Sequence, residues 1–239
     1  TFTPHVITII DGWEITYYFL DDDIDGDFDL IYSMMGDGVY RIPGNPDATF
    51  GPEEIIHDGS INYYRIYNTD FDNDGDRDLL MGTQDGMPDL SYLENLGGGS
   101  YAEPILILEA LLQRPNIAEF ADMDGDGDED WILGFGYEYY GLKYYENTGE
   151  ALADEYDFME SSGGGVAVGD MDLDGDLDIV GLFTHSQHKW IRGNGDGTFE
   201  EGEELPVDIW EDTGWLDALS SVHPVSYTHL RAHETDSYL

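Results

Sequence analysis

The 239-residue chain is predicted to be an all-β protein, a β-propeller made of four-stranded blades. Three observations predict this: an acidic motif occurs four times, β-rich segments flank every copy, and the copies are about 50 residues apart. Four strands of five or six residues with turns between them fill a repeat of that length. A helical turn is conceivable only over 109–114, where a loop or strand end fits equally well.

The repeated motif reads D-x-D-x-D-G-D-x-D. Its four copies start at Asp21, Asp70, Asp122 and Asp170, which are 49, 52 and 48 residues apart. A second landmark is an Asn that follows the last Asp of each copy by 16 or 17 residues, and turn residues follow this Asn. These asparagines are Asn45, Asn95, Asn147 and Asn194.

Between the landmarks, each repeat is expected to contain four strands. The first strands precede the acidic motifs, at 15–20, 62–67, 117–120 and 165–168. The second are short apolar runs after the motifs, at 30–32, 79–81, 131–133 and 179–180. The third are aromatic, at 92–93, 144–145 and 190–191, and the fourth begin near Phe50, Tyr101 and Phe199. The repeats then span about 13–58, 59–110, 111–160 and 161–208.

Each motif concentrates five or six carboxyl groups in nine residues. Two carboxylates about 5 Å apart repel by roughly 3 kcal/mol at an effective dielectric of 20, so a cation is needed. Side chains at positions 1, 3 and 5 converge when the chain wraps around a point, and Gly at position 6 permits the sharp turn. Position 7 offers its carbonyl oxygen and Asp at position 9 closes the shell. This all-oxygen cage suits a hard divalent cation, Ca²⁺ before Mg²⁺.

About four calcium sites are therefore expected. The metal-binding residues are Asp21, Asp23, Asp25, Asp27 and Asp29; Asp70, Asp72, Asp74, Asp76 and Asp78; Asp122, Asp124, Asp126, Asp128 and Asp130; Asp170, Asp172, Asp174, Asp176 and Asp178.

The motif allows two other interpretations. An EF-hand or dockerin-like loop needs a bidentate Glu at position 12 and flanking helices. Position 12 here is Tyr32, Met81, Leu133 or Gly181, none of which has a carboxylate, so this interpretation is rejected. A solvated acidic turn without a metal is disfavoured because the same spacing recurs four times with Gly in register.

Residues 170–180 and the turn Asn194-Gly195-Asp196-Gly197-Thr198-Phe199 resemble FG-GAP and VCBS repeats, which also make up the integrin α-subunit propeller. The resemblance covers residues 1–217 and is weaker in the Gly turns of the first and third repeats. It implies a propeller, usually of seven blades, with calcium loops between the first and second strands of a blade. The chain would be a fragment with about four complete blades plus partial ones.

The resemblance also implies a secreted or cell-surface protein that binds proteins or glycans. We therefore expect a calcium-binding adhesion module located outside the cell, on its surface or in the periplasm, and part of a larger parent chain. The alternative is the propeller domain of a polysaccharide-active enzyme such as a lyase; a pure scaffold role is a third possibility. An enzyme is less favoured because 22 of the 53 acidic residues lie in the motifs, and no catalytic motif was found.

Outside the motifs, few residues suggest chemistry. His185 and His188, three residues apart, are expected on a loop and could bind a transition metal or serve a lyase, although ordinary loop residues are favoured. Tyr137 to Tyr140 are a candidate sugar-binding surface. Tyr63, Tyr64, Tyr144 and Tyr145 are expected to pack between sheets.

The formal net charge of −45 disfavours nucleic acid and anionic membranes, and it favours cationic partners. No Cys is present, which excludes disulfides and Cys-based metal sites. No apolar stretch approaches the roughly 20 residues of a membrane-spanning helix. Residues 1–224 are assigned to the propeller fragment. Residues 225–239 resemble a translated sequencing adapter and are expected to be a non-native tail, with a natural polar tail as the alternative.

Overall fold

The structure is a computed structural model that describes residues 15–34, 37–58, 63–83, 89–108, 115–135, 141–149, 152–158, 165–184 and 187–205. Five predictions lie outside these residues: the helical turn at 109–114, the tyrosines at 137–140, the loop position of His185, a partial blade after 208, and the tail at 225–239.

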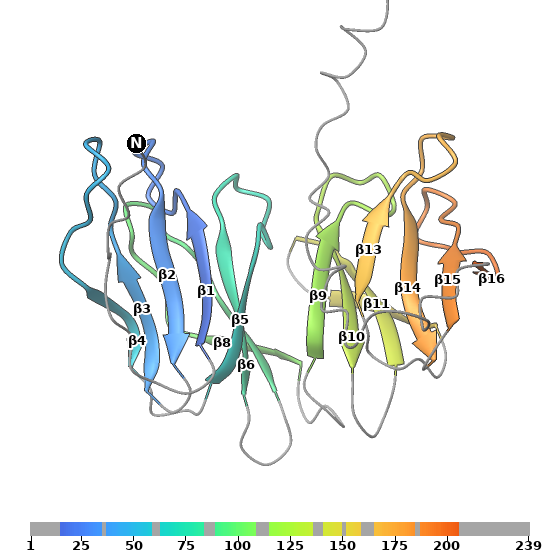
Figure 1. Cartoon of the computed structure of the whole chain (residues 1–239), viewed down its shortest axis with the longest axis horizontal. Helices are drawn as coiled ribbons and strands as arrows, with labels where there is room; N and C mark the ends of the chain where they lie inside the picture. Colours follow the sequence, from blue (N-terminus) through green and yellow to red (C-terminus); the bar gives the residue numbers. More distant parts are fainter. Residues whose placement is uncertain are drawn as a thin grey trace, which may run out of the picture. The chain divides into compact units, whose positions relative to one another are not determined.

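The only regular secondary structure among the described residues is the β-strand, and the strands form four four-stranded sheets in which each strand lies beside its neighbour in sequence (Figure 1). The first sheet contains β1 (Ile15–Leu20), β2 (Asp29–Met34), β3 (Gly38–Ile42) and β4 (Glu54–Asp58). The second contains β5 (Tyr63–Thr69), β6 (Asp78–Thr83), β7 (Leu90–Leu93) and β8 (Ile105–Leu108). The third contains β9 (Pro115–Ala121), β10 (Asp130–Phe135), β11 (Gly141–Asn147) and β12 (Leu152–Asp157). The fourth contains β13 (Val166–Gly169), β14 (Asp178–Thr184), β15 (Gln187–Ile191) and β16 (Glu203–Glu204).

The second strand of each sheet is buried over most of the residues whose burial is described. In β10 every residue is buried, and in β2 only the last residue is partly exposed. A strand covered on both faces needs apolar residues in succession rather than in alternation, which explains the continuous apolar runs after the motifs. The predicted second strands are confirmed, and each is longer than predicted.

The fourth strands begin later than the sequence predicts. Phe50, Tyr101 and Phe199 form isolated bridges, and continuous pairing starts at β4, β8 and β16. Pro52 and Pro104 follow the first two bridges. Because proline has no backbone N–H to donate to a ladder, strand pairing is interrupted at these positions.

The chain divides into two compact units, each with its own core. The first unit contains β1 to β8 together with Gly127–Glu129 and Tyr145–Asp154. In it, β5 lies against β1 and β2, and the side chains packed between the two sheets are Leu20, Ile31, Val39, Ile66, Leu79, Met81 and Leu93. The second unit contains Asn116–Asp126, Asp130–Tyr144 and the described residues from Glu155 onward. Its core comprises Met123, Ile132, Leu142, Tyr144, Phe158, Val166, Ile179 and Ile191.

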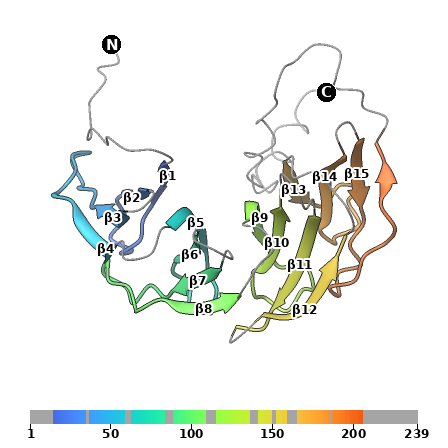
Figure 2. The same ribbon diagram turned by 90° about the horizontal axis from the view of Figure 1, so that it is seen from below.

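Within each sheet the strands follow one another in a simple meander, as Figure 2 shows for β9 to β12. The prediction of an all-β protein built from four-stranded repeats is therefore confirmed. Among the described residues, no helix has the length and apolar character needed to cross a membrane.

Candidate metal centres

The four acidic motifs form loops that connect the first strand of each sheet to the second. We call them the first loop (residues 21–29), second loop (70–78), third loop (122–130) and fourth loop (170–178). This placement between first and second strands is the one that the sequence resemblance implied.

Each loop turns through two residues with left-handed backbone. The glycine at position 6 has φ between 96° and 105° in all four loops, as the predicted sharp turn requires. Position 4 is also left-handed, which the sequence analysis missed. The sequence did contain a signal for this conformation: two of the loops have Asn or Gly at position 4, and both residues tolerate a left-handed backbone. The position 4 residues are Ile24, Asn73, Gly125 and Leu173.

The carboxylate at position 1 holds the turn. Asp21 accepts hydrogen bonds from the backbone N–H groups of Asp25 and Gly26, both at 3.0 Å. Asp170 accepts the equivalent bonds in the fourth loop from Asp174 and Gly175, at 3.1 and 3.2 Å. The chain therefore wraps around the position 1 side chain before any ion is considered.

The carboxylate at position 9 fastens the loop to the sheet. Asp78 is fully buried, and its two oxygens accept the backbone N–H groups of Phe71, at 3.0 Å, and Asn95, at 2.7 Å. Asp29 and Asp178 make the same two kinds of bond in their loops. Position 9 thus joins the loop to the end of the third strand.

Oxygens from three carboxylates converge in every loop. In each group, one ligand atom per residue lies within 4.8 Å of the other two. The first, second and fourth loops bring together positions 1, 3 and 9, whereas the third loop brings together positions 1, 3 and 5. The groups are Asp21, Asp23 and Asp29; Asp70, Asp72 and Asp78; Asp122, Asp124 and Asp126; and Asp170, Asp172 and Asp178.

The remaining predicted metal-binding residues lie in the same loops but outside these groups. At position 5 in three loops, the carboxylate accepts the backbone N–H of position 7, as in the 2.9 Å bond from Asp27 to Asp25. The residues outside the groups are Asp25, Asp27, Asp74, Asp76, Asp128, Asp130, Asp174 and Asp176.

The second loop has the electrostatic character of a cation site. Burial raises the pKa of Asp78 to about 7, although backbone hydrogen bonds oppose the rise. Burial and the nearby carboxylates of Asp74 and Asp72 raise the pKa of Asp76 to about 6. One oxygen each of Asp72 and Asp76 is completely buried and accepts no hydrogen bond. A cation beside these oxygens would restore the charged form and satisfy the unpaired acceptors.

The donor set fits a hard divalent cation. All grouped atoms are carboxylate oxygens, the ligand type that Ca²⁺ and Mg²⁺ prefer. The EF-hand alternative stays rejected, because its position 12 falls on the second strands β2, β6, β10 and β14 rather than in the loop.

The asparagine landmark corresponds to two different structural positions. Asn95 bridges to Tyr101, whereas the equivalent bridges to Phe50 and Phe199 are made by Gly44 and Gly193. This shift explains why the spacing is 16 residues in the first and fourth repeats and 17 residues in the second and third. The amides of Asn45 and Asn194, one residue later, donate to the hydroxyls of their own turns, those of Thr49 and Thr198.

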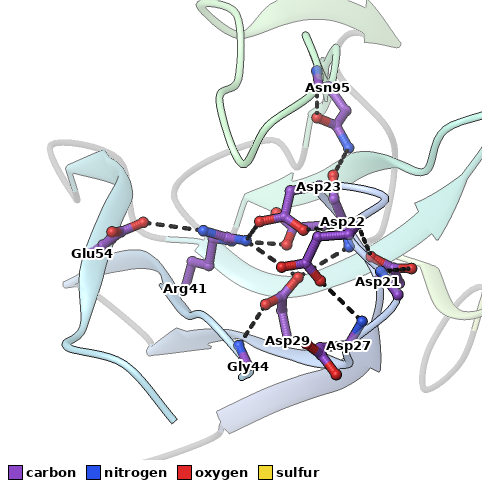
Figure 3. Close-up of polar contacts among 12 residues, drawn as sticks. Asp21, Asp22, Asp23, Asp27, Asp29, Arg41, Gly44, Glu54 and Asn95 are labelled. Atoms are coloured by element: carbon purple, nitrogen blue, oxygen red, sulfur yellow. Dashed lines mark hydrogen bonds and ion pairs between the residues drawn. The ribbon is translucent and has the colours of Figure 1, made fainter. Parts of the chain in front are cut away.

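The first loop differs from the others by a buried arginine, Arg41, which the sequence analysis missed. Figure 3 shows the Arg41 guanidinium directed at the loop. It pairs with Asp22 at 2.7 Å, with Asp23 at 2.5 Å and with Asp29 at 3.2 Å. On its other side it contacts Glu54 at 3.2 Å. The signal in the sequence was the additional Asp at position 2 of this motif.

The histidine prediction is only partly covered. His188 is buried on β15 rather than on a loop, so the expectation of a loop position is wrong for this residue, and its Nδ1 makes no hydrogen bond. His185 lies outside the described residues. Tyr144 and Tyr145 are buried, as predicted for packing residues.

Comparison with known proteins identifies the repeat. A family model described as an FG-GAP-like repeat matches residues 70–133, which run from the start of the second loop to the middle of β10. A search of curated proteins found no match. The matched segment includes the second and third acidic loops and the strands between them. Residues 70–133 of the chain therefore contain an FG-GAP-like repeat.

Proposed function

We propose that the chain is a calcium-stabilised β-propeller module that binds a protein or a carbohydrate ligand outside the cell. The observation that carries the proposal is the convergence of three carboxylates in every one of the four loops. Four sheets of four strands with these loops at the same connection are the expected parts of such a module. The sheets would be blades of a seven-bladed ring contributed in part by other segments of a longer chain.

Calcium is proposed over magnesium because the two ions make different demands on coordination geometry. Magnesium demands near-ideal octahedral geometry, whereas calcium accepts six to eight oxygens in flexible arrangements. Four bound ions would change the formal net charge from −45 to about −37.

The proposed role of calcium is structural. Position 9 is hydrogen-bonded to the end of the third strand, so an ion bound to it would connect the loop with the sheet. Binding only to the folded state adds directly to folding stability. Affinities of about 10⁻⁴ to 10⁻³ M, typical of extracellular modules, would suffice there. This consideration, together with the resemblance, supports the proposed location.

Thermal unfolding tests the metal proposal. We expect the midpoint to rise with millimolar CaCl₂ and to fall after treatment with a chelator, with MgCl₂ at the same concentration giving a smaller rise. Asp70→Asn should reduce the calcium-dependent shift, because it removes one grouped carboxylate. An identical midpoint with calcium and with chelator would refute the proposal.

The ligand proposal needs a separate measurement. A glycan array and a pulldown from extracellular extracts, each with calcium and with chelator, would identify the ligand class. The net charge predicts that a protein ligand presents a cationic surface, so its binding should weaken as salt is raised. Salt-independent capture would contradict that part of the proposal.

A further inference from the structure

Arg41 occupies a strand position that is aromatic in the other repeats. Tyr92 lies three residues before Asn95 in the second repeat. Tyr144 lies three residues before Asn147, so it holds the same position in the third repeat. The pairing of third strands with second strands gives the other equivalences: Arg41 with Ile31, Tyr92 with Leu80, and Trp190 with Val180.

The residue at loop position 2 changes together with this strand position. In the second repeat, Phe71 and Tyr92 pack with ring centroids 4.6 Å apart. In the first repeat, the same two positions hold Asp22 and Arg41, joined by an ion pair of 2.7 Å. A buried ion pair has therefore replaced an aromatic pair at the base of the first loop.

Arg41 also occupies carboxylates that a metal ion would need. Two of the three grouped residues of the first loop, Asp23 and Asp29, are paired with its Nη2. The Arg41 side chain is only 5% exposed, and a guanidinium stays protonated in proteins. The first loop thus contains a permanent positive charge, which would repel an incoming divalent ion.

The position of Arg41 is fixed from the second repeat as well. A Cβ atom placed on Gly99 would lie 2.6 Å from Arg41 Nη1, so the Gly turn of the second repeat lies directly on the guanidinium. In the same way, a Cβ atom placed on Gly197 would lie 3.1 Å from the hydroxyl oxygen of Tyr144. Arg41 is therefore held in place between two repeats.

The fourth loop has a weaker version of this contact. Arg192 lies 3.3 Å from Asp172, which is one grouped carboxylate of that loop. Its side chain is 29% exposed and also pairs with Glu200 and Glu203. Water and these competing carboxylates reduce its effect on a metal ion, because exposed pairs are strongly screened.

We propose that Arg41 is the resident cation of the first loop, so that this loop folds without a divalent ion and binds one at least tenfold more weakly than the other three loops. The inference rests on the proposed calcium binding and specifies which loops perform it. The Arg41 side chain neutralises the carboxylates that calcium would neutralise elsewhere.

A matched pair of variants tests this without altering Arg41. Asp21 and Asp170 hold the same loop position and accept the same two backbone hydrogen bonds. Calcium binding to the chelator-treated full chain is measured by isothermal titration calorimetry. Wild type should show three strong sites; Asp170→Asn should lose one of them, and Asp21→Asn should keep all three. Loss of a strong site in Asp21→Asn would overturn the inference.

A gain of binding provides the second test. The double variant Asp22→Phe with Arg41→Tyr installs the aromatic pair of the second repeat and leaves Asp21, Asp23 and Asp29 unpaired by arginine. It should show four strong sites, with circular dichroism confirming that it folds. The control is Arg77→Gln, because Arg77 pairs with Glu129 and not with a grouped carboxylate of the second loop. This variant should keep the three strong calcium sites of the wild type.

The outcomes separate this inference from the proposed function. Four equivalent strong sites in wild type would overturn the role of Arg41 while supporting calcium binding. Three strong sites in both wild type and a folded double variant would also overturn it. No calcium binding in any variant would overturn the proposed function, and the inference with it.

Discussion

The Asn95 side chain donates a hydrogen bond from Nδ2 to the main-chain carbonyl oxygen of Asp22, 2.7 Å away and 73 residues earlier in the chain. The same amide group contacts the carbonyl oxygen of Arg77 in its own loop at 3.2 Å. Asn147 repeats the arrangement with the carbonyl oxygen of Phe71, at 2.8 Å. One asparagine therefore connects the acidic loops of two successive repeats.

We expect Asn95→Ala to destabilise the folded protein by about 2 to 3 kcal/mol, because it leaves buried carbonyl oxygens without a donor. The control is Asn194→Ala, whose amide bonds only to the exposed Thr198 hydroxyl and should cost less than about 0.5 kcal/mol. Urea unfolding in saturating calcium measures both. Equal losses would show that the connection between loops contributes nothing.

Replacing Leu173 with glycine should stabilise the protein by about 1 kcal/mol. Leu173 has φ of 66° and is 84% exposed, so it has a strained backbone and little packing to lose. Leu96, also exposed at 58%, is not among the residues with positive φ, and Leu96→Gly should be neutral or destabilising. Melting temperatures measure both effects. A shift of the melting temperature in the same direction for both variants would contradict the proposed backbone strain at Leu173.

Gly193 should tolerate no side chain. A Cβ atom there would lie 2.1 Å from the carbonyl oxygen of Leu177, and backbone cannot move aside cheaply. We expect Gly193→Ala to cost more than about 2 kcal/mol. Gly141 has open space around its Cβ direction, so Gly141→Ala is the matched control and should change stability by less than about 1 kcal/mol. Chemical denaturation distinguishes the two, and a tolerated Gly193→Ala would be evidence against the close approach.

Glu119 on β9 predicts a specific pH dependence. Burial raises its pKa from 4.5 to about 7, so the folded state binds the proton more tightly than the unfolded state does. The contribution of this group to stability is therefore greatest below pH 4.5 and is lost as the pH rises through 7.

The test is Glu119→Gln, which removes the charge with little change in shape. At pH 8 this variant should be more stable than wild type by about 2 kcal/mol, after allowance for the partial exposure of the group. At pH 4 the two should be nearly equal. Calcium is kept saturating so that the loops contribute equally to both proteins. A difference that does not change with pH would contradict the assignment.

The sequence was sufficient for the features that depend on local pattern. The short apolar and aromatic runs and the motif Gly at position 6 identified the strands and the turns, because both follow from backbone geometry within a few residues. Side chains at positions 1, 3, 5 and 9 were all expected to bind the metal, and the third loop groups positions 1, 3 and 5, which are Asp122, Asp124 and Asp126. Elsewhere position 9 takes the place of position 5.

That exchange could not be read from spacing. Asp78 points toward the grouped carboxylates because one of its oxygens accepts the backbone N–H of Asn95, at the end of the third strand. The carboxylate of Asp74 instead accepts the backbone N–H of Asp76 within the turn. Which carboxylates remain available depends on hydrogen bonds from residues distant in sequence. The late start of the fourth strands has instead a local cause, because Pro52 and Pro104 follow the isolated bridges of Phe50 and Tyr101.

The sequence by itself determined that the chain is an all-β repeat protein with four acidic loops, because hydrophobic pattern and motif spacing act locally. Only the tertiary structure decided that the loops differ. Arg41 is 19 residues from Asp22 in the chain, and strand pairing alone brings its guanidinium to that carboxylate. Asn95 reaches the same loop from the next repeat. The net charge around each loop therefore depends on which side chains the folded structure brings next to its carboxylates.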